Sequence, residues 1–340
     1  MKTNSTIKKI FAMLLACAMM LAFAACGSSP APAASEAPAA EDDGTVKVAI
    51  IKQLDHASLD EIANAIAARF DEMNAAGDVK VEYSISSGQN DQTILKQLCD
   101  QAIADKVDVI VPIATTAAQV ATLSAEGTGV KVVYAAISDP AAANLTGIDY
   151  VTGTSDALNT FFILDMMFAQ NPDIKKIGLL YSLSEPNSAT PIADAKAYLD
   201  AKNIEYVEQT ANTNDEVVAA ASALIAADVD AIFTPTDNTI MAAELAIYED
   251  LAKAGIPHYT GADSFVRNGA FATCGVNYTE LGRKTAELAV RAVSGEALQD
   301  FYLMDGGIIT VNTETAAALG ADYSVFADMG ELVEVTTTKD

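Results

Sequence analysis

The chain has 340 residues, 51% of them hydrophobic, so it is long enough for two packed lobes and is not disordered over most of its length. Lys and Arg number 20 against 46 Asp and Glu, and the formal net charge of -26 argues against binding to nucleic acids or anionic membrane surfaces. The two histidines, His56 and His258, are far apart, and the common motifs of phosphate binding, dinucleotide binding, serine hydrolysis and zinc proteolysis are absent. The composition therefore gives little support to an enzyme.

The N-terminus is predicted to be a secretory signal. Three lysines lie ahead of the apolar stretch IFAMLLACAMMLAFAA, which is too short and ends in residues too small for a comfortable membrane-spanning helix. It leads into FAAC, which resembles the cleavage motif of bacterial lipoproteins, with Phe23 where that motif more often has Leu. We expect residues 1–25 to be removed and Cys26 to carry a lipid. The alternative is an ordinary signal peptide with an incidental cysteine.

Residues 26–44 are predicted to form a flexible tether. The segment GSSPAPAASEAPAAEDDG is rich in Pro, Ala and Ser and lacks periodic apolar residues, so it cannot bury a core. The folded part should begin near Thr45. It keeps Cys99 and Cys274, and because each lies within its own apolar pattern without metal-ligand spacing, we expect separate buried thiols rather than a disulfide.

From Thr45 onward, short β-branched runs alternate with helical patterns. In the first half, strands are predicted at 46–52, 79–86 and 107–114, followed by helices at 59–77, 90–106 and 115–127. The rhythm resumes after residue 155, with strands at 175–182, 204–210 and 229–235, and helices at 156–172, 187–203, 214–228 and 238–255. This alternation is typical of a parallel sheet covered by helices on both faces, so the expected fold class is α/β with doubly wound sheets.

The two halves resemble each other. IADKVDVIVP at 103–112 and IAADVDAIFTP at 225–235 share Ile, Ala, Val, Asp and Ile at the same spacing, and GVKVVYA and GIPHYTG occupy the same next place. Short apolar strands match by chance, but here the order of the elements is repeated as well. The sequence therefore predicts two similar α/β lobes.

Polar residues follow the predicted strands in both halves. In open parallel sheets the ligand crevice lies beyond the carboxyl ends of the strands, where helix N-termini offer N–H groups and the positive end of a dipole. Each such residue has a structural alternative as a helix cap or turn residue. The candidates are Ser87, Thr115, Thr116, Ser138 and Asp139 in the first half, and Tyr181, Asn187, Ser188, Thr236, Asp237, Asn238 and Asp263 in the second.

Several motifs of the chain recur together in one protein family. They are DHASLDEI at 55–62, SSGQNDQTILKQL at 86–98, VDVIVPIATTAAQVA at 107–121, ISDP at 137–140, IGLLYSLSEPNS at 177–188, FTPTDNTI at 233–240 and GADSFVRNGAFATCGVNYTELG at 261–282. Together they resemble the solute-binding lipoproteins of ABC importers, and more narrowly the family that includes tryptophan and tyrosine binders, with the type I periplasmic binding protein fold. Gln89 departs from the family, which often has Asp there, and we assign it no role.

This resemblance implies two lobes joined by a hinge, with the chain crossing between them more than once. The first lobe would hold residues 45–153 and about 279–305, and the second would hold 154–278 and about 306–340. A ligand would bind between the lobes and be enclosed when they close.

The resemblance also implies which residues hold an amino acid. Its α-carboxylate would be bound by Ser87, Thr115 and Thr116. Its ammonium group would be bound by Asp237, with Asp263 as a second carboxylate. Further polar contacts would come from Asn187, Ser188 and Asn238. Tyr181 would lie against the ligand side chain or pack within its own lobe.

These features predict a binding protein, not an enzyme, anchored by lipid to the outer face of the cytoplasmic membrane, with no cofactor or metal. It would capture a small amino acid, with an aromatic one favoured by the resemblance alone, and deliver it to an ABC permease and its ATPase. A monomer is expected, since closure of two lobes needs no second subunit. The alternatives are a branched-chain amino acid, a sugar or a nucleoside as ligand, or a sensory receptor component of the same fold. The absence of Trp disfavours a sugar.

Overall fold

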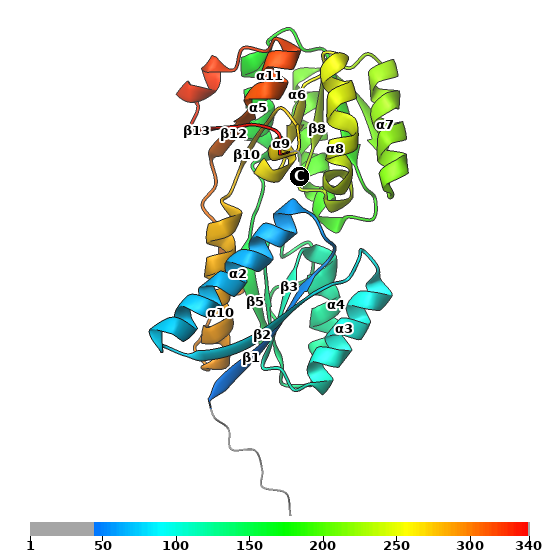
Figure 1. Cartoon of the computed structure of the whole chain (residues 1–340). Helices are drawn as coiled ribbons and strands as arrows, with labels where there is room; N and C mark the ends of the chain where they lie inside the picture. Colours follow the sequence, from blue (N-terminus) through cyan, green and yellow to red (C-terminus); the bar gives the residue numbers. More distant parts are fainter. Residues whose placement is uncertain (1–43, 339–340) are drawn as a thin grey trace, which may run out of the picture. The chain divides into compact units, whose positions relative to one another are not determined.

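The computed structural model describes residues 44–338, which form two α/β lobes (Figure 1). Each lobe is built on one sheet. The first sheet has six strands in the order β11-β5-β4-β3-β1-β2, and the second has seven in the order β13-β12-β10-β9-β8-β6-β7. The predicted signal peptide, the lipidation site Cys26 and the tether, apart from Gly44, lie outside the described residues.

The first lobe has parallel strands throughout. Its strands are β1 (Thr45–Lys52), β2 (Lys80–Ser87), β3 (Val109–Ile113), β4 (Lys131–Tyr134), β5 (Val151–Ser155) and β11 (Tyr302–Leu303), and its helices are α2 (Ala57–Ala76), α3 (Gln92–Ala104), α4 (Thr115–Ala125) and α10 (Tyr278–Val293). Side chains of β1 alternate between two cores: Val48 and Ile50 belong to the cluster that includes α2, and Ala49 and Ile51 to the cluster of α3 and α4. Both faces of this sheet are therefore covered.

The second lobe follows the same plan. Its strands are β6 (Lys176–Tyr181), β7 (Glu205–Thr210), β8 (Ala231–Thr234), β9 (His258–Thr260), β10 (Ala272–Gly275), β12 (Ile308–Asn312) and β13 (Glu331–Val335). Its helices are α5 (Thr160–Gln170), α6 (Ala189–Lys202), α7 (Asn214–Ala226), α8 (Asn238–Lys253), α9 (Asp263–Arg267) and α11 (Thr313–Leu319), with short 3-10 turns η1 (Pro186–Ser188) and η2 (Ser324–Asp328). The predicted α/β fold of two parallel-sheet lobes is confirmed; the antiparallel pair β10–β12 was not predicted.

The chain passes between the sheets three times, after β5, after β10 and after β11. β5 was not among the predicted strands, because VTGTS is short and contains a glycine. The helix predicted at 156–172 begins at Thr160, so Asp156 lies in the segment that leaves the first sheet. This difference matters for the site described below.

Cys99 and Cys274 are buried and unbridged, one in each lobe. Burial raises the pKa of the Cys99 thiol to about 12 and that of Cys274 to about 11, so both stay protonated and unreactive at neutral pH.

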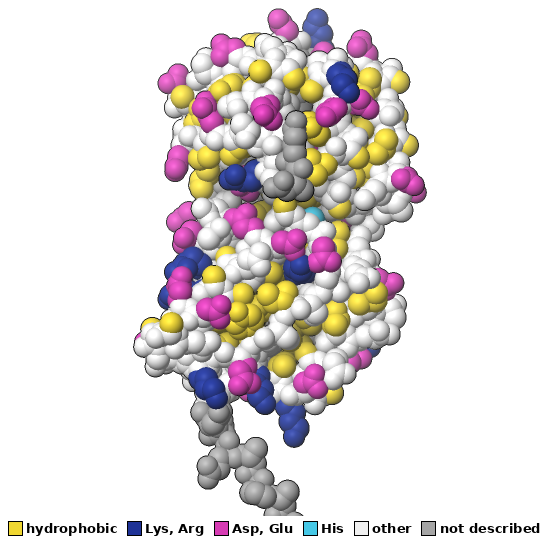
Figure 2. All heavy atoms as spheres, in the orientation of Figure 1, with side chains coloured by type: hydrophobic (Ala, Val, Ile, Leu, Met, Phe, Trp, Pro, Cys, Tyr) yellow, Lys and Arg dark blue, Asp and Glu magenta, His cyan; other side chains and the backbone are white. Residues whose placement is uncertain are grey.

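The surface carries the negative charge that the composition predicts. Figure 2 shows Asp and Glu side chains spread over one face of both lobes. Within residues 44–338, no helix is long and apolar enough to cross a membrane, and no group of three or more His, Cys, Asp or Glu residues is placed to hold a metal ion.

Helices α2 and α10 pack against each other very closely, at Gly282. A Cβ atom added at Gly282 would lie 2.7 Å from the Cβ of Ala65 and 2.7 Å from the carbonyl oxygen of Ile62. Because α2 begins just after His56 and α10 begins at Tyr278, this contact fixes where those two side chains lie.

Substitution Gly282→Ala should therefore destabilise the protein by about 1–3 kcal/mol, since overpacking forces the two helices apart. Helix propensity alone would make the alanine variant more stable by about 0.5–1 kcal/mol. The sign of the change in the free energy of unfolding therefore shows whether the close packing outweighs helix propensity. Thermal unfolding measures it. Adding Ala65→Gly, which removes the facing methyl group, should recover part of the loss. A Gly282→Ala variant that melts above the wild type would contradict this packing.

Candidate ligand-binding site

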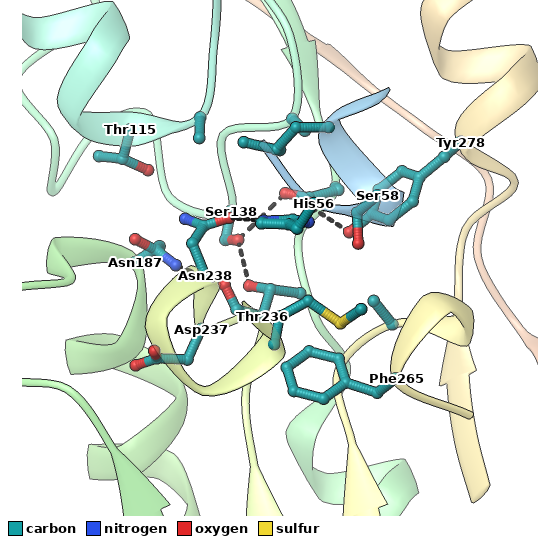
Figure 3. Close-up of a pocket in the computed structure, with 16 residues that line it drawn as sticks. His56, Ser58, Thr115, Ser138, Asn187, Thr236, Asp237, Asn238, Phe265 and Tyr278 are labelled. Carbon is teal, nitrogen blue, oxygen red and sulfur yellow. Dashed lines mark hydrogen bonds between the residues drawn. The ribbon is translucent and has the colours of Figure 1, made fainter. Parts of the chain in front are cut away.

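A cavity lies between the two lobes, at the carboxyl ends of the central strands (Figure 3). The first lobe contributes His56, Ser58, Leu59, Ala114, Thr115, Ala136, Ser138, Asp156 and Tyr278, and the second contributes Asn187, Thr236, Asp237, Asn238, Met241, Ala262 and Phe265. The cavity volume is about 20 Å³, close to the space that one water molecule needs. The described conformation is therefore a tightly closed one.

Hydrogen bonds between side chains hold the lobes together around this cavity. The bonded pairs are Ser138–Thr236 at 2.9 Å, His56–Asn238 at 3.0 Å, Gln53–Glu185 at 2.8 Å, Asp139–Thr190 at 3.0 Å and Ser58–Ser264. The three bonds between neutral side chains contribute only about 0.5–1.5 kcal/mol each net, because the same groups bond to water when separated, and a bond to a charged carboxylate contributes about 1.5–3 kcal/mol. Opening of the hinge is consequently compatible with these contacts.

Two alanines that line the cavity from the first lobe have a strained backbone conformation. Ala114, directly after β3, has φ 78° and ψ 162°, and Ala136 has φ 57°. Such conformations cost on the order of 1–3 kcal/mol for a residue with a Cβ and concentrate at ligand sites. At Ala114 the turn ends the strand abruptly, so that α4 begins at Thr115 with its N-terminal end at the cavity. The positive end of a helix dipole favours a negatively charged group there.

Asp156 is a buried carboxylate without a cation. It is 5% exposed and lies directly after β5. Ser138 Oγ donates to its Oδ1 at 3.0 Å, and Tyr278 Oη donates to its Oδ2 at 3.0 Å. Burial raises the pKa of Asp156, although these two hydrogen bonds oppose the shift. Because folding disfavours the ionised form, the carboxylate destabilises the folded protein at neutral pH unless a cation approaches it.

Asp237 also lines the cavity, but both its oxygens have donors from the protein. It caps α8: Oδ1 accepts from the backbone N–H groups of Thr239 at 3.1 Å and Ile240 at 3.0 Å. Oδ2 accepts from the Ser182 backbone N–H and the Ser188 hydroxyl, each at 2.7 Å. Burial raises the pKa of Asp237 and these bonds lower it. Its geometry is that of a helix cap that ties α8 to the end of β6.

A third buried carboxylate, Glu185, lies behind Asn238. Gln53 Nε2 donates to its Oε1 at 2.8 Å, and Asn238 Nδ2 donates to its Oε2 at 2.7 Å. Burial, with the nearby charge of Asp237, raises the pKa of Glu185. Among the described residues, no Lys or Arg lines the cavity. The site therefore favours a ligand that carries a positive charge.

Half of the predicted site residues line the cavity. They are Thr115, Ser138, Asn187, Thr236, Asp237 and Asn238. Two more support it from behind: Ser188 donates to Asp237, and the Thr116 N–H donates to Gln53 Oε1 at 3.2 Å. Asp139 accepts from the backbone N–H of Ala142 and from Thr190, which places it in the contact between the lobes.

Three predicted residues lie away from the cavity. Tyr181 donates to Glu208 at 2.8 Å, and Ser87 Oγ accepts from the Gln89 N–H at 3.4 Å. Asp263 pairs with Arg267 at 3.1 Å in a separate cavity. Ser87 and Asp263 therefore do not line the cavity in this conformation, and their expected contacts with a ligand stay predictions.

Four polar residues that line the cavity were not predicted: His56, Ser58, Asp156 and Tyr278. His56 and Asp156 follow β1 and β5, so their position after a strand is the signal in the sequence that marks them. Ser58 and Tyr278 lie in the first turns of α2 and α10. Nothing in the local sequence of Tyr278 marks it, because the close packing of α10 on α2 brings it to the cavity.

The second histidine belongs to the core of the second lobe. His258 Nδ1 lies 3.0 Å from Glu244 Oε1, and His258 Nε2 lies 2.8 Å from Thr234 Oγ1. All three side chains are buried, at most 2% exposed, and none lines the cavity. Thr234, His258 and Glu244 place a hydroxyl, an imidazole and a carboxylate side by side, but a substrate in the cavity cannot reach them.

Known proteins resemble this chain in sequence and in structure. Residues 47–325 match the family described as ABC transporter substrate binding protein. A tyrosine-binding protein of Clostridioides difficile (strain R20291) is 28% identical over 279 residues, 80% of each chain. An ABC domain in complex with L-Trp from Streptococcus pneumonia is 28% identical, with a TM-score of 0.77 over 85% of this chain and 100% of that chain. A ligand-free, open substrate binding protein from Clostridium difficile is 27% identical, with a TM-score of 0.64 over 86% and 100%.

The different donors of the two cavity carboxylates predict opposite effects of Asp→Asn substitution on stability. At Asp237, three of the four donors are backbone N–H groups, which cannot accept from an amide, so Asp237→Asn should cost about 1–2 kcal/mol. At Asp156 both donors from other residues are hydroxyls, which can turn to accept, and a buried charge is removed. Asp156→Asn should therefore melt at or above the wild-type temperature at pH 7. Thermal unfolding of both variants measures this, and a larger loss at Asp156 would contradict it.

Proposed function

This chain belongs to the family of ABC transporter substrate-binding proteins, and we propose that it captures a small amino acid, an aromatic one, between its lobes. The observation that carries the proposal is Asp156, a buried carboxylate at the cavity whose two protein partners are neutral hydroxyls. The tyrosine-binding and L-Trp-bound relatives support an aromatic amino acid.

The ammonium group of the ligand is assigned to Asp156. The sequence resemblance pointed to Asp237, but four donors from other residues already occupy that carboxylate, whereas each oxygen of Asp156 accepts one side-chain hydrogen bond. A carboxylate oxygen has room for a second donor. A cation beside Asp156 would also lower its raised pKa and remove the cost of its burial.

The α-carboxylate of the ligand is assigned to the N-terminal end of α4, at Thr115. Its hydroxyl and the helix dipole favour a negative group at that end. Thr116 acts less directly, since its N–H is bonded to Gln53.

The ligand side chain is assigned to the apolar part of the wall. Leu59, Met241 and Phe265 line the cavity and are each at most 3% exposed. An aromatic amino acid is far larger than the closed cavity of about 20 Å³, so the ligand enters when the hinge opens and the lobes then close on it.

The protein acts outside the cytoplasm, as members of this family do. The N-terminal sequence supports export, removal of residues 1–25 and attachment of a lipid at Cys26. In this proposal the closed, loaded form delivers the amino acid to an ABC permease and its ATPase. It acts as a monomer.

The function is tested by thermal shift on the soluble fragment that begins after Cys26, with the twenty amino acids, sugars and nucleosides as ligands. A ligand at a hundred times its dissociation constant stabilises a protein by about 2.7 kcal/mol, which raises the midpoint by a few degrees. We expect this shift with an aromatic amino acid. Because the chain contains no Trp, the fluorescence of bound tryptophan also reports affinity directly.

Asp156→Asn should abolish most of the shift at the same ligand concentration, since an amide does not balance an ammonium charge. Asp263→Asn is the matched control, because that carboxylate pairs with Arg267 outside the cavity. A shift with sugars or nucleosides alone would refute the amino acid. An unchanged shift in Asp156→Asn would refute the assigned role of this residue.

A further inference from the structure

We propose that capture of the ligand is coupled to the uptake of one proton, which Glu185 takes from water as the lobes close. The inference rests on the proposed function, because closure around a ligand is the step that brings in the proton. It is carried by the place of Glu185 at the contact between the lobes. This residue of the second lobe is 2% exposed and accepts a hydrogen bond from Gln53 of the first lobe at 2.8 Å.

The carboxyl group of Glu185 is buried among neutral amides. Gln53 Nε2 donates to its Oε1, Asn238 Nδ2 donates to its Oε2 at 2.7 Å, and the Asn187 amide lies close by. Burial, together with the charge of Asp237, raises the pKa of Glu185 from the ordinary 4.5 to about 8, although the three amides oppose the shift. At neutral pH the closed protein therefore holds Glu185 mainly in its protonated form.

Of the two neighbouring carboxylates, Glu185 and not Asp237 takes the proton. Asp237 accepts four hydrogen bonds, and three of them come from backbone N–H groups, which only donate. Each of these bonds favours the ionised form of Asp237. Two like charges in the same buried region disfavour each other, so the carboxylate with fewer donors becomes neutral.

The hydrogen-bond network around Glu185 accommodates the proton. The Thr116 N–H donates to Gln53 Oε1 at 3.2 Å, which leaves Gln53 Nε2 facing Glu185 Oε1. The proton therefore belongs on Oε2, which faces Asn238. An Asn amide can turn end for end without changing shape, so its oxygen then accepts from Glu185 and its nitrogen donates to His56 Nε2. His56 can accept there in its other neutral tautomer, so every partner is retained.

The charged groups around Glu185, within residues 44–338, do not balance its charge. At the ends of the surrounding elements they are Asp237 on α8, Lys52, Asp55, His56, Asp60 and Glu61 from β1 to the first turn of α2, Asp91 before α3, Asp139 after β4 and Glu216 on α7. The one Lys of this set, Lys52, pairs with Asp55 at 2.6 Å and also with Asp60. His56 is neutral in the closed form, because burial lowers the pKa of its imidazole to about 4.

Opening of the hinge reverses the effect of burial on Glu185. Gln53 leaves with the first lobe, water hydrates the carboxylate, and its pKa falls toward 4.5. Between about pH 5 and about pH 8 the closed form therefore binds a proton that the open form does not. Closure is favoured at the lower end of this window and loses that advantage as the pH rises through about 8, by at most about ten-fold per pH unit.

Other titratable groups of the site shift in the opposite direction. Closure lowers the pKa of His56, and a cation beside Asp156 lowers the pKa of that carboxylate. Both changes release protons. Net uptake of a proton on binding therefore points to Glu185.

The test is calorimetric titration of L-tyrosine, L-tryptophan and L-phenylalanine into the fragment that begins after Cys26, at about pH 7.5 in phosphate and in Tris. These buffers differ in ionisation enthalpy, so the difference between the two observed binding enthalpies gives the number of protons exchanged. We expect uptake of about 0.5–1 proton per ligand bound. No uptake, or release, would overturn the inference and leave the proposed function standing. Failure of all three amino acids to bind would overturn both.

The variant Glu185→Gln assigns the proton to this residue. Glutamine has the shape of the protonated carboxyl group, with an acceptor for Gln53 and a donor for Asn238. Proton uptake should fall toward zero, and at about pH 8 the variant should bind at least as tightly as the wild type, since it needs no proton to close. A residue that only supports the fold would instead weaken binding at every pH when substituted.

Glu249→Gln is the matched control, because Glu249 is exposed on α8 and pairs with Lys253. It should keep the proton uptake of the wild type, whose affinity should weaken about three- to ten-fold between about pH 7 and about pH 8. Thermal unfolding confirms that both variants fold. Undiminished uptake in Glu185→Gln would refute the assignment, and the wild-type titrations in the two buffers test the coupling whether or not this variant folds.

Discussion

The site depends on a carboxylate that folding buries without a cation. Asp156 leaves the end of β5, is held by Ser138 and Tyr278, and has its pKa raised by burial. The protein bears the cost of this charge in the free state, so a cationic ligand that approaches it gains a large electrostatic interaction. Asp237 is the carboxylate that the sequence resemblance favoured for the ammonium group. In the structure it caps α8 and links that helix to the end of β6.

The arrangement of the sheets explains why these groups meet. In each lobe the central parallel strands end at the same edge, and the three crossings of the chain set the two edges against each other. Neutral side-chain hydrogen bonds, such as Ser138–Thr236 and His56–Asn238, then close the lobes. Because such bonds are weak individually, the hinge opens readily, and ligand contacts decide how long it stays closed.

The sequence predicted the fold and the family, and six of the twelve predicted site residues line the cavity. The repeated β/α rhythm and the motifs LYSLSEPNS and PTDNTI carried that information. It did not predict β5, and so Asp156 was placed in a helix that begins at Thr160. The sequence also does not reveal which buried carboxylate is hydrogen-bonded by the protein itself. The four donors to Asp237 belong to residues 182, 188, 239 and 240, and folding is needed to bring all four to this carboxylate.

The central claim is that Asp156 binds the ammonium group of an amino acid. The most direct measurement is calorimetric binding of L-tyrosine and of 3-(4-hydroxyphenyl)propanoate, which lacks the amine, to the wild type and to Asp156→Asn. We predict that loss of the amine weakens binding to the wild type by at least about 30-fold and has far less effect in the variant. An equal loss in both proteins would contradict the account, because the amine would then be bound elsewhere.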